Sequence, residues 1–358
     1  MCTRTIAIHY VRAALRGARR TGRDTSAVLA DAGIAAALLR DDRARVTVDQ
    51  YTALIQALWD LLDDEFMGFG ARRSKRGTFP MMCLLVVHCP DLAAALRRGW
   101  AFYDLFDGAP RACLRESGRG SVRFELDTSG FDDPDHFLTE SLLLLWHRFA
   151  SWLIGRRIPL RYVDLGYPEP AHGAEYHLMF GCPLRFRQPG TALGIDARFL
   201  AMPVVQDELT LRRYLRRSPA DLLSRRDYGV DLASQVRRIL AAGLARGPAA
   251  RPVRDSGSDG DQRRLPSAEE VAARLGMSAP TLRRRLLHDG MSFRAVREQL
   301  LRDEAVASLV SGRESVEQLA LRLGFSEASA FHRAFRRWTG NSPGAYRAGG
   351  HPSTQRPG

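Results

Sequence analysis

A chain of 358 residues is long enough for two domains, and its 45% hydrophobic and 26% charged residues are typical of a globular protein. It carries 53 basic and 40 acidic residues, a formal net charge of +13, which indicates a polyanionic partner such as nucleic acid unless an arginine-rich genome explains the excess. No apolar run reaches about eighteen residues and no apolar leader follows the N-terminus, so we expect a cytoplasmic protein with no membrane partner.

The first 205 residues mix helical and strand patterns, and we expect them to form one α+β domain. Helical periodicity covers residues 48–62, 91–106 and 137–154. Strands are predicted at 111–114 and at 121–126, where Val122, Phe124 and Leu126 alternate with polar residues, and residues 161–165 are a third candidate.

Aromatic residues in this region are candidates for the wall of a small-molecule pocket, because such pockets combine apolar walls with a few polar groups. Most aromatic residues at helical spacing simply belong to the core, and a lone histidine is more often a hydrogen-bonded core residue than part of a site. The pattern therefore does not identify a ligand. The candidates are His88, Trp100, Phe102, Tyr103, Phe106, Trp146, His147 and Trp152.

An enzymatic alternative would pair Cys83 or Cys89 with His88 as nucleophile and base. Residues adjacent in sequence rarely have the required geometry, and the chain lacks a Gly-x-Ser-x-Gly motif, a phosphate loop and a metal motif. Its five cysteines include no Cys-x-x-Cys pair, which argues against a disulfide framework and a zinc site. We therefore expect no catalytic residues, no metal and no cofactor.

Residues 206–227 predict a helical interdomain linker. The wider stretch from 204 to 244, with its leucines and paired arginines, could form a dimer or partner surface or a solvated basic helix. A segment rich in Gly, Pro, Ser and Asp at about 246–264 indicates a flexible insertion. We expect an all-α C-terminal domain at 228–348 and a disordered tail at 349–358.

A seven-residue pattern occurs twice in the C-terminal region, as AARLGMS at 272–278 and as ALRLGFS at 320–326, which is a spacing of 48 (320 − 272). Each copy predicts a short helix, a turn on a glycine and an arginine-rich second helix, which is typical of a helix-turn-helix unit. Ser267 and Ser315 begin capping boxes for the first helices, and Gly276 and Gly324 suit left-handed turns.

The second helix of the first unit is predicted to have an apolar and a basic face. Leu282 and Leu286 lie four residues apart and share one face, so Arg284 points away from them. Ser278 is expected to cap this helix.

In the second unit, Phe331, Phe335 and Trp338 form the apolar face, and Ser326 is expected to cap the helix. A connecting helix is predicted at 293–309, which would hold the two recognition helices about 34 Å apart, as successive major grooves require. An ordinary helical bundle with a solvated arginine face is the alternative, and the duplication argues against it.

Residues 315–347 closely resemble the C-terminal signature of AraC/XylS-type transcription regulators. The resemblance rests on the Gly-Phe-Ser turn, the run Phe-x-Arg-x-Phe-Arg-x-Trp-x-Gly and the closing Ser-Pro-x-x-Tyr-Arg. It implies a seven-helix domain with two DNA-reading helices that begins near residue 228. The segment at 246–264 departs from this pattern, although loop length costs little free energy.

The N-terminal region is similar to the effector domain of the subgroup that contains ornithine- and arginine-utilisation regulators. The similarity rests on RGTF at 76–79, DLAAAL at 91–96 and EYHLMFGCPLRF at 175–186. It implies that residues 1–205 bind a small molecule and dimerise.

Motif positions within this family assign DNA contacts to both units, and arginine suits guanine because it can donate two hydrogen bonds to O6 and N7. The predicted base contacts are Pro280, Arg283, Arg284, Ser329, His332 and Arg333. The predicted phosphate contacts are Ser278, Arg285, Ser326, Arg336 and Arg337.

We therefore expect a sequence-specific DNA-binding transcription regulator, an activator that responds to a small-molecule effector. Its expected partners are double-stranded DNA, RNA polymerase and a second copy of the chain. The alternative is a regulator that needs no ligand or that responds to a protein partner, and ligand-dependent DNA affinity would distinguish the two.

Overall fold

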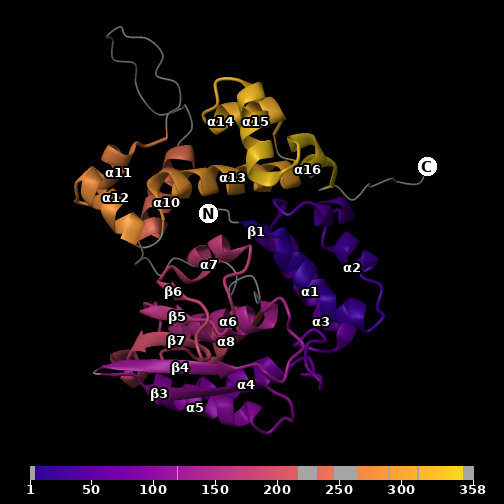
Figure 1. Ribbon diagram of the computed structural model, residues 1–358, viewed down its shortest axis with the longest axis vertical. Coiled ribbons are helices and arrows are strands. Elements are labelled where there is room, and N and C mark those ends of the chain that lie inside the picture. Colours follow the sequence, from indigo (N-terminus) through magenta and orange to yellow (C-terminus); the bar gives the residue numbers. More distant parts are fainter. Residues whose placement is uncertain are drawn as a thin grey trace. The chain divides into compact units, whose positions relative to one another are not determined.

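The computed structural model describes residues 5–118, 120–216, 232–245, 265–288, 291–312 and 314–349 (Figure 1). They divide into two compact units. The sheet unit comprises the described parts of 9–32 and 51–228, and the helical unit comprises those of 1–8, 33–50 and 229–358. The predicted insertion at 246–264, the tail after residue 349 and residues 217–227 of the predicted linker lie outside the described residues.

The sheet unit has the mixed α+β composition that the sequence predicts. Its helices are α1 (Ile8–Arg20), α2 (Ser26–Asp31), α3 (Val48–Leu62), α4 (Thr78–Val86), α5 (Leu92–Tyr103), α6 (Phe137–Leu153), α7 (Gly173–Phe180), the short η2 (Ala197–Ala201) and α8 (Glu208–Arg216). Its strands are β3 (Arg111–Glu116), β4 (Ser121–Asp127), β5 (Tyr162–Asp164), β6 (Leu184–Arg185) and β7 (Thr191–Asp196).

The five strands form one sheet in the order β3-β4-β7-β5-β6, in which only β5 and β6 run parallel. Because side chains alternate across a strand, each strand contributes to two different faces. Val122, Phe124 and Leu126 are buried, as predicted, and the Phe124 ring stacks on Trp100 of α5 with 5.2 Å between centroids. One face of the sheet therefore closes the aromatic core of this unit.

The helical unit contains the C-terminal helices and, in addition, two short N-terminal strands. Its elements are β1 (Thr5–Ala7), η1 (Ala36–Arg40), β2 (Arg45–Thr47), α10 (Leu232–Ala245), α11 (Ala268–Arg274), α12 (Ala279–His288), α13 (Phe293–Ser311), α14 (Val316–Arg322), α15 (Ala328–Thr339) and α16 (Pro343–Gly349). The long helix α13 lies at the centre of this unit, with α10 to α12 toward one end and α14 to α16 toward the other (Figure 1).

A buried polar network joins the N-terminal strands to the C-terminal helices within the helical unit. The Thr5 hydroxyl donates to the Asp303 carboxylate on α13, and Arg237 of α10 donates to the other carboxylate oxygen at 2.8 Å. Arg45 donates its Nε to the Thr5 hydroxyl at 2.7 Å and its backbone N–H to the Tyr346 hydroxyl at 2.7 Å. The described residues up to 8 and those from 33 to 50 therefore belong to the helical unit.

The sequence locates most long elements to within three residues. The helix predicted at 48–62 coincides with α3, and the connecting helix predicted at 293–309 is α13, which extends to Ser311. Among the described residues, none of the helices combines the length and apolarity needed to cross a membrane.

Candidate nucleic-acid interface and ligand cavity

The first helix-turn-helix unit begins with a complete capping box. The Ser267 hydroxyl accepts from the Glu270 N–H at 3.2 Å, and the Glu270 carboxylate accepts from the Ser267 N–H at 2.7 Å. The chain then turns at Gly276, whose φ of 67° suits glycine because it has no Cβ. The Met277 N–H donates to the Ala272 carbonyl at 3.0 Å, which closes α11 and lets α12 begin at once.

Helix α12 has the two faces that the sequence predicts. Leu282 and Leu286 are completely buried, whereas Arg284 is exposed on the opposite side. Ser278 caps the helix by accepting from the Thr281 N–H at 3.3 Å. The predicted DNA contacts on this unit all lie on its exposed surface, namely Ser278, Pro280, Arg283, Arg284 and Arg285.

The exposed arginines of α12 differ in how they are paired. Arg283 donates to the Glu269 carboxylate at 2.9 Å, so part of its charge is already compensated. Arg284 and Arg285 have no side-chain ion pair or hydrogen bond within the part of the chain that the structure describes. Two guanidinium groups on this helix are therefore available to an external anion.

The second unit repeats the same construction. Ser315 and Gln318 form its capping box, with N–H to oxygen distances of 2.9 and 3.1 Å, and Gly324 turns the chain at a φ of 84°. Phe331 and Phe335 are completely buried on one face of α15. The predicted DNA contacts on α15 occupy the opposite, exposed face, namely Ser329, His332, Arg333, Arg336 and Arg337.

The prediction that Ser326 caps α15 is wrong by one residue. The N-cap is Glu327, and its side chain makes no capping hydrogen bond. The turn that follows Gly324 is one residue longer than the turn that follows Gly276, so α15 begins at Ala328. Ser326 is nevertheless exposed at this end of the helix, where its hydroxyl is accessible.

Arginines that are paired within the helical unit can be separated from those that have no partner among the described residues. Arg322 donates to the Glu314 carboxylate at 2.6 Å and lies on α14, away from the exposed face of α15. Burial favours the neutral form of Glu314, but hydrogen bonds from Arg322 and Ser308 outweigh it and hold the pKa of this carboxyl below its usual value. Arg333 and Arg336 have no such partner among the described residues.

The predicted pocket residues of the sheet unit lie in different environments. Trp100, Tyr103 and Trp146 are buried and pack against one another, whereas 47% of Phe106 is exposed and Phe102 is half-buried. The remaining three make specific contacts: the exposed His88 lies 3.1 Å from Glu208, His147 hydrogen-bonds the Ile158 carbonyl at 2.7 Å, and Trp152 stacks on Tyr214 with 4.5 Å between centroids.

Of these candidates, Tyr103 and Trp146 line a largely apolar cavity of the sheet unit, which has a volume of about 390 Å³. The sequence reasoning missed the other lining residues because they come from separate segments. The RGTF motif at 76–79 is the one signal that points to the cavity, since Arg76, Gly77 and Phe79 all line it. The others are Gln56, Trp59, Glu65, Phe66, Pro80, Pro110, Leu142, Leu145, Leu215 and Arg216.

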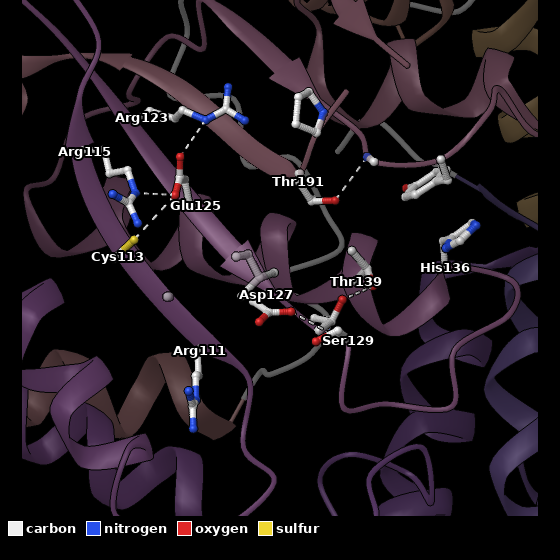
Figure 2. A pocket seen from close by; sticks show the side chains of 17 residues that line it. Arg111, Cys113, Arg115, Arg123, Glu125, Asp127, Ser129, His136, Thr139 and Thr191 are labelled. Atoms are coloured by element: carbon white, nitrogen blue, oxygen red, sulfur yellow. Dashed lines mark hydrogen bonds and ion pairs between the residues drawn. The ribbon is translucent and has the colours of Figure 1, made fainter. Parts of the chain in front are cut away.

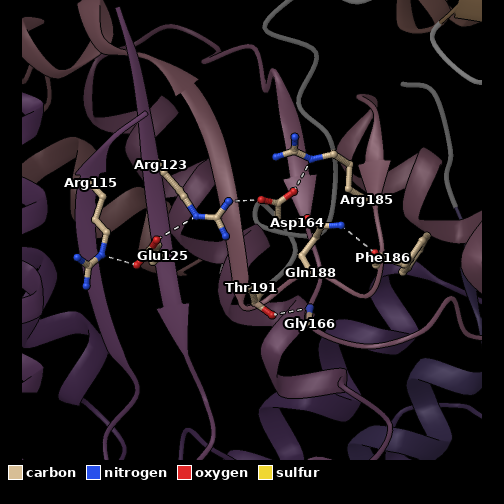
Figure 3. Close-up of polar contacts among 9 residues, drawn as sticks. All are labelled: Arg115, Arg123, Glu125, Asp164, Gly166, Arg185, Phe186, Gln188 and Thr191. Carbon is tan, nitrogen blue, oxygen red and sulfur yellow. Dashed lines mark hydrogen bonds and ion pairs between the residues drawn. The ribbon is translucent and has the colours of Figure 1, made fainter. Parts of the chain in front are cut away.

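A second cavity of about 640 Å³ lies over the polar face of the sheet (Figure 2). Most of the charged side chains on this face form ion pairs with one another. Glu125 accepts from Arg115 at 2.7 Å and from Arg123 at 3.0 Å, and Arg123 and Arg185 both donate to the buried Asp164 (Figure 3). This alternating row of charges stabilises the exposed face of the sheet and leaves little uncompensated charge for a ligand.

The enzymatic alternative is not supported by the surroundings of the cysteines. Cys83 and Cys89 are buried, and burial raises the pKa of both thiols, which disfavours the nucleophilic thiolate. His88 is exposed and paired with Glu208 instead. Within the described residues, no group of three or more His, Cys, Asp or Glu side chains could hold a metal ion.

Two family models match the chain. Residues 22–204 match the arabinose-binding domain of AraC transcription regulators, and residues 271–349 match a helix-turn-helix domain. The chain is 29% identical to the ornithine utilization regulator of Pseudomonas aeruginosa over 65% of its own length and 63% of that protein. It is 30% identical to the regulator VirS of Mycobacterium tuberculosis over 57% of its length and 54% of that protein.

The matched stretches therefore span less than two thirds of these curated relatives. Among solved structures, the transcriptional regulator CdpR of Pseudomonas aeruginosa is similar at 18% identity with a TM-score of 0.29. That alignment covers 96% of this chain and 98% of that one.

Proposed function

Because the chain belongs to the AraC family of transcription regulators, a class without enzymatic activity, we propose that it is a sequence-specific DNA-binding regulator in the cytoplasm. The observation that carries the proposal is the repeated construction of α12 and α15. Each helix buries an apolar face and exposes arginines that have no partner among the described residues. One continuous helix, α13, joins the two helix-turn-helix units and gives them a rigid connection.

The two recognition helices would enter successive major grooves and read base edges there. A guanidinium that donates twice to guanine discriminates against other bases by about 1–3 kcal/mol. Arg284 and Arg333, which face away from the buried residues of their helices, are the proposed guanine contacts. The other proposed base contacts are Pro280, Arg283, Ser329 and His332, and the proposed phosphate contacts are Ser278, Arg285, Ser326, Arg336 and Arg337.

The test is DNA binding by the full chain to its own upstream intergenic DNA and to random DNA of equal length, across a salt series. Arg284→Ala and Arg333→Ala should each weaken specific binding about tenfold and change binding to random DNA much less. Arg297→Ala removes an exposed arginine of α13 and serves as the matched control, which should bind like the wild type. Equal losses on both DNAs would contradict the assignment of base contacts.

We also propose that the sheet unit binds a small-molecule effector in the 390 Å³ cavity and that the protein acts as an activator, as a homodimer in contact with RNA polymerase. The size of the cavity and its apolar walls are typical of small-molecule sites. An effector can change DNA affinity only if it binds one arrangement of the regulator more tightly than another.

The competing proposal is a regulator that needs no ligand, or that is controlled by a protein partner through the surface around α8. It predicts that no compound that binds the cavity alters DNA affinity. A change in DNA affinity at saturating ligand would exclude it.

A further inference from the structure

The 390 Å³ cavity of the sheet unit combines aromatic walls with the carboxylate of Glu65. Five aromatic side chains line it, namely Trp59, Phe66, Phe79, Tyr103 and Trp146. Leu142, Leu145 and Leu215 complete the apolar part of the wall. Among the described residues that line it, only Glu65 carries a carboxylate.

The Glu65 carboxylate is held in place by two backbone amides. Oε1 accepts from the Gly77 N–H at 2.8 Å, and Oε2 accepts from the Phe79 N–H at 2.8 Å. Each carboxylate oxygen can accept at least one further hydrogen bond, so both retain capacity toward a ligand. Within the described residues, no arginine, lysine or histidine forms an ion pair with Glu65.

Arg76 forms its ion pair with another carboxylate and not with Glu65. Arg76 also lines the cavity, but its guanidinium pairs with Asp60. Burial raises the pKa of Glu65 above its usual value, although the two amides and Arg76 oppose this effect. A partly buried negative charge without a counter-ion is costly, and a bound cation would relieve that cost.

The aromatic residues next to Glu65 are placed to favour a cation as well. The Trp59 indole N–H donates to the Glu65 carbonyl at 3.1 Å, which holds this ring beside the carboxylate. The Tyr103 ring lies 6.4 Å from Phe66 and 6.3 Å from Trp146, so three aromatic rings adjoin on one side of the cavity. Ring faces attract ammonium and guanidinium groups, most strongly where water is excluded.

We propose that this cavity binds an organic cation, an amine with an apolar body, whose ammonium group pairs with Glu65 while the body packs against the aromatic walls. This inference deepens the proposed effector function and rests on it for its biological role. Arg216 at the rim is exposed, so water and salt screen its charge from a ligand. The half-buried Glu65 carboxylate is therefore the charged group that we expect to attract a ligand.

The test uses three probes with the same carbon skeleton, 4-phenylbutylamine, 4-phenyl-1-butanol and 4-phenylbutyrate, with calorimetry on the full chain. The amine should bind at least about tenfold more tightly than the alcohol, and the carboxylate should bind most weakly. Glu65→Gln should abolish the preference for the amine and keep the affinity for the alcohol. Glu208→Gln removes an equal charge from outside the cavity and should keep the preference.

Two further measurements keep the test valid if Glu65→Gln does not fold. Phe79→Leu retains apolar volume but removes an aromatic face, so it should weaken amine binding more than alcohol binding and thereby reduce the amine preference. In the wild type, amine affinity should rise with pH above the usual Glu pKa near 4.5, while alcohol affinity stays constant. A preference for the alcohol or the carboxylate would overturn the inference, as would an amine preference that survives Glu65→Gln.

Failure of this inference and failure of the proposed function give different results. Specific DNA binding without amine binding would remove the inference and leave the regulator. Amine binding to a chain that does not prefer any DNA sequence would support the cavity assignment and contradict the regulatory proposal.

Discussion

Removal of the Asp303 carboxylate should strongly destabilise the helical unit. Its side chain is only 6% exposed, and that of Arg237, its ion-pair partner, is 7% exposed. The carboxylate also accepts from the Thr5 hydroxyl and lies 3.6 Å from Arg302 Nε. One side chain therefore links β1 and α10 to the central helix α13.

The size of the effect follows from the burial of the pair. Asp303→Ala removes the carboxylate that pairs with the buried Arg237 guanidinium, and loss of one member of a buried pair costs about 3–5 kcal/mol of unfolding free energy. Most domains are stable by only about 5–15 kcal/mol, so this variant should be near the limit of folding. The double variant Arg237→Met with Asp303→Leu should recover at least half of the loss, because well-packed apolar residues can replace a buried ion pair.

The assay must report on the helical unit alone, because a chain with two units need not unfold in one step. Trp338 is the only one of the five tryptophans in this unit. Urea unfolding of the full chain labelled with 5-fluorotryptophan and followed by fluorine NMR would therefore isolate its transition. Hydrogen exchange at residues 5–8 and 44–47 should accelerate in the same variant, since β1 loses its contact with α13.

Glu298 on the same helix provides the matched control. Its ion pairs with Arg294 and Arg337 are solvent-exposed, at 3.6 and 3.3 Å, so Glu298→Ala should cost less than about 1 kcal/mol. If Asp303→Ala costs no more than Glu298→Ala, or if the double variant is as unstable as the single one, the buried network does not stabilise the unit.

Three further predictions concern caps, pH and salt. Ser267→Ala and Ser315→Ala should each lower the unfolding free energy of the helical unit by about 1 kcal/mol, measured by the same fluorine signal, and an unchanged midpoint would contradict their capping role. Glu140 accepts a hydrogen bond from the Tyr176 hydroxyl, and burial raises the pKa of this carboxyl in the folded state. The stabilisation by the protonated side chain is therefore complete below the usual Glu pKa of 4.5 and is lost as pH rises through the folded-state pKa. Relative to Glu140→Gln, the wild type should therefore lose unfolding free energy as pH rises above 4.5, and a constant difference in urea titrations would refute this. Arg336→Ala should lower the salt slope of DNA binding by about one, and an unchanged slope in the anisotropy titrations would exclude a phosphate contact.

The helix-turn-helix units could be predicted from sequence because every interaction that defines them is local. Capping boxes span three residues, the glycine turns follow directly, and Leu282 and Leu286 share a face through helical periodicity alone. The cap of α15 is the exception, because the length of a turn depends on how the next helix packs, and the extra residue at Glu327 left no mark in the pattern. The sequence also located α3 and α13 closely, since long amphipathic helices carry a strong periodic signal.

Contacts between distant segments decided the rest. Thr5 and Asp303 are 298 positions apart, and neither residue type nor periodicity indicates that they meet. The cavity takes its walls from five helices and the loops between them, so the predicted pocket residues included Tyr103 and Trp146 but not Glu65. Sequence alone therefore determined the two-faced character of α12 and α15 through local hydrogen bonding and periodicity. Which side chains surround a ligand, and where the N-terminal strands pack, depended on tertiary packing, because burial is a property of the whole fold.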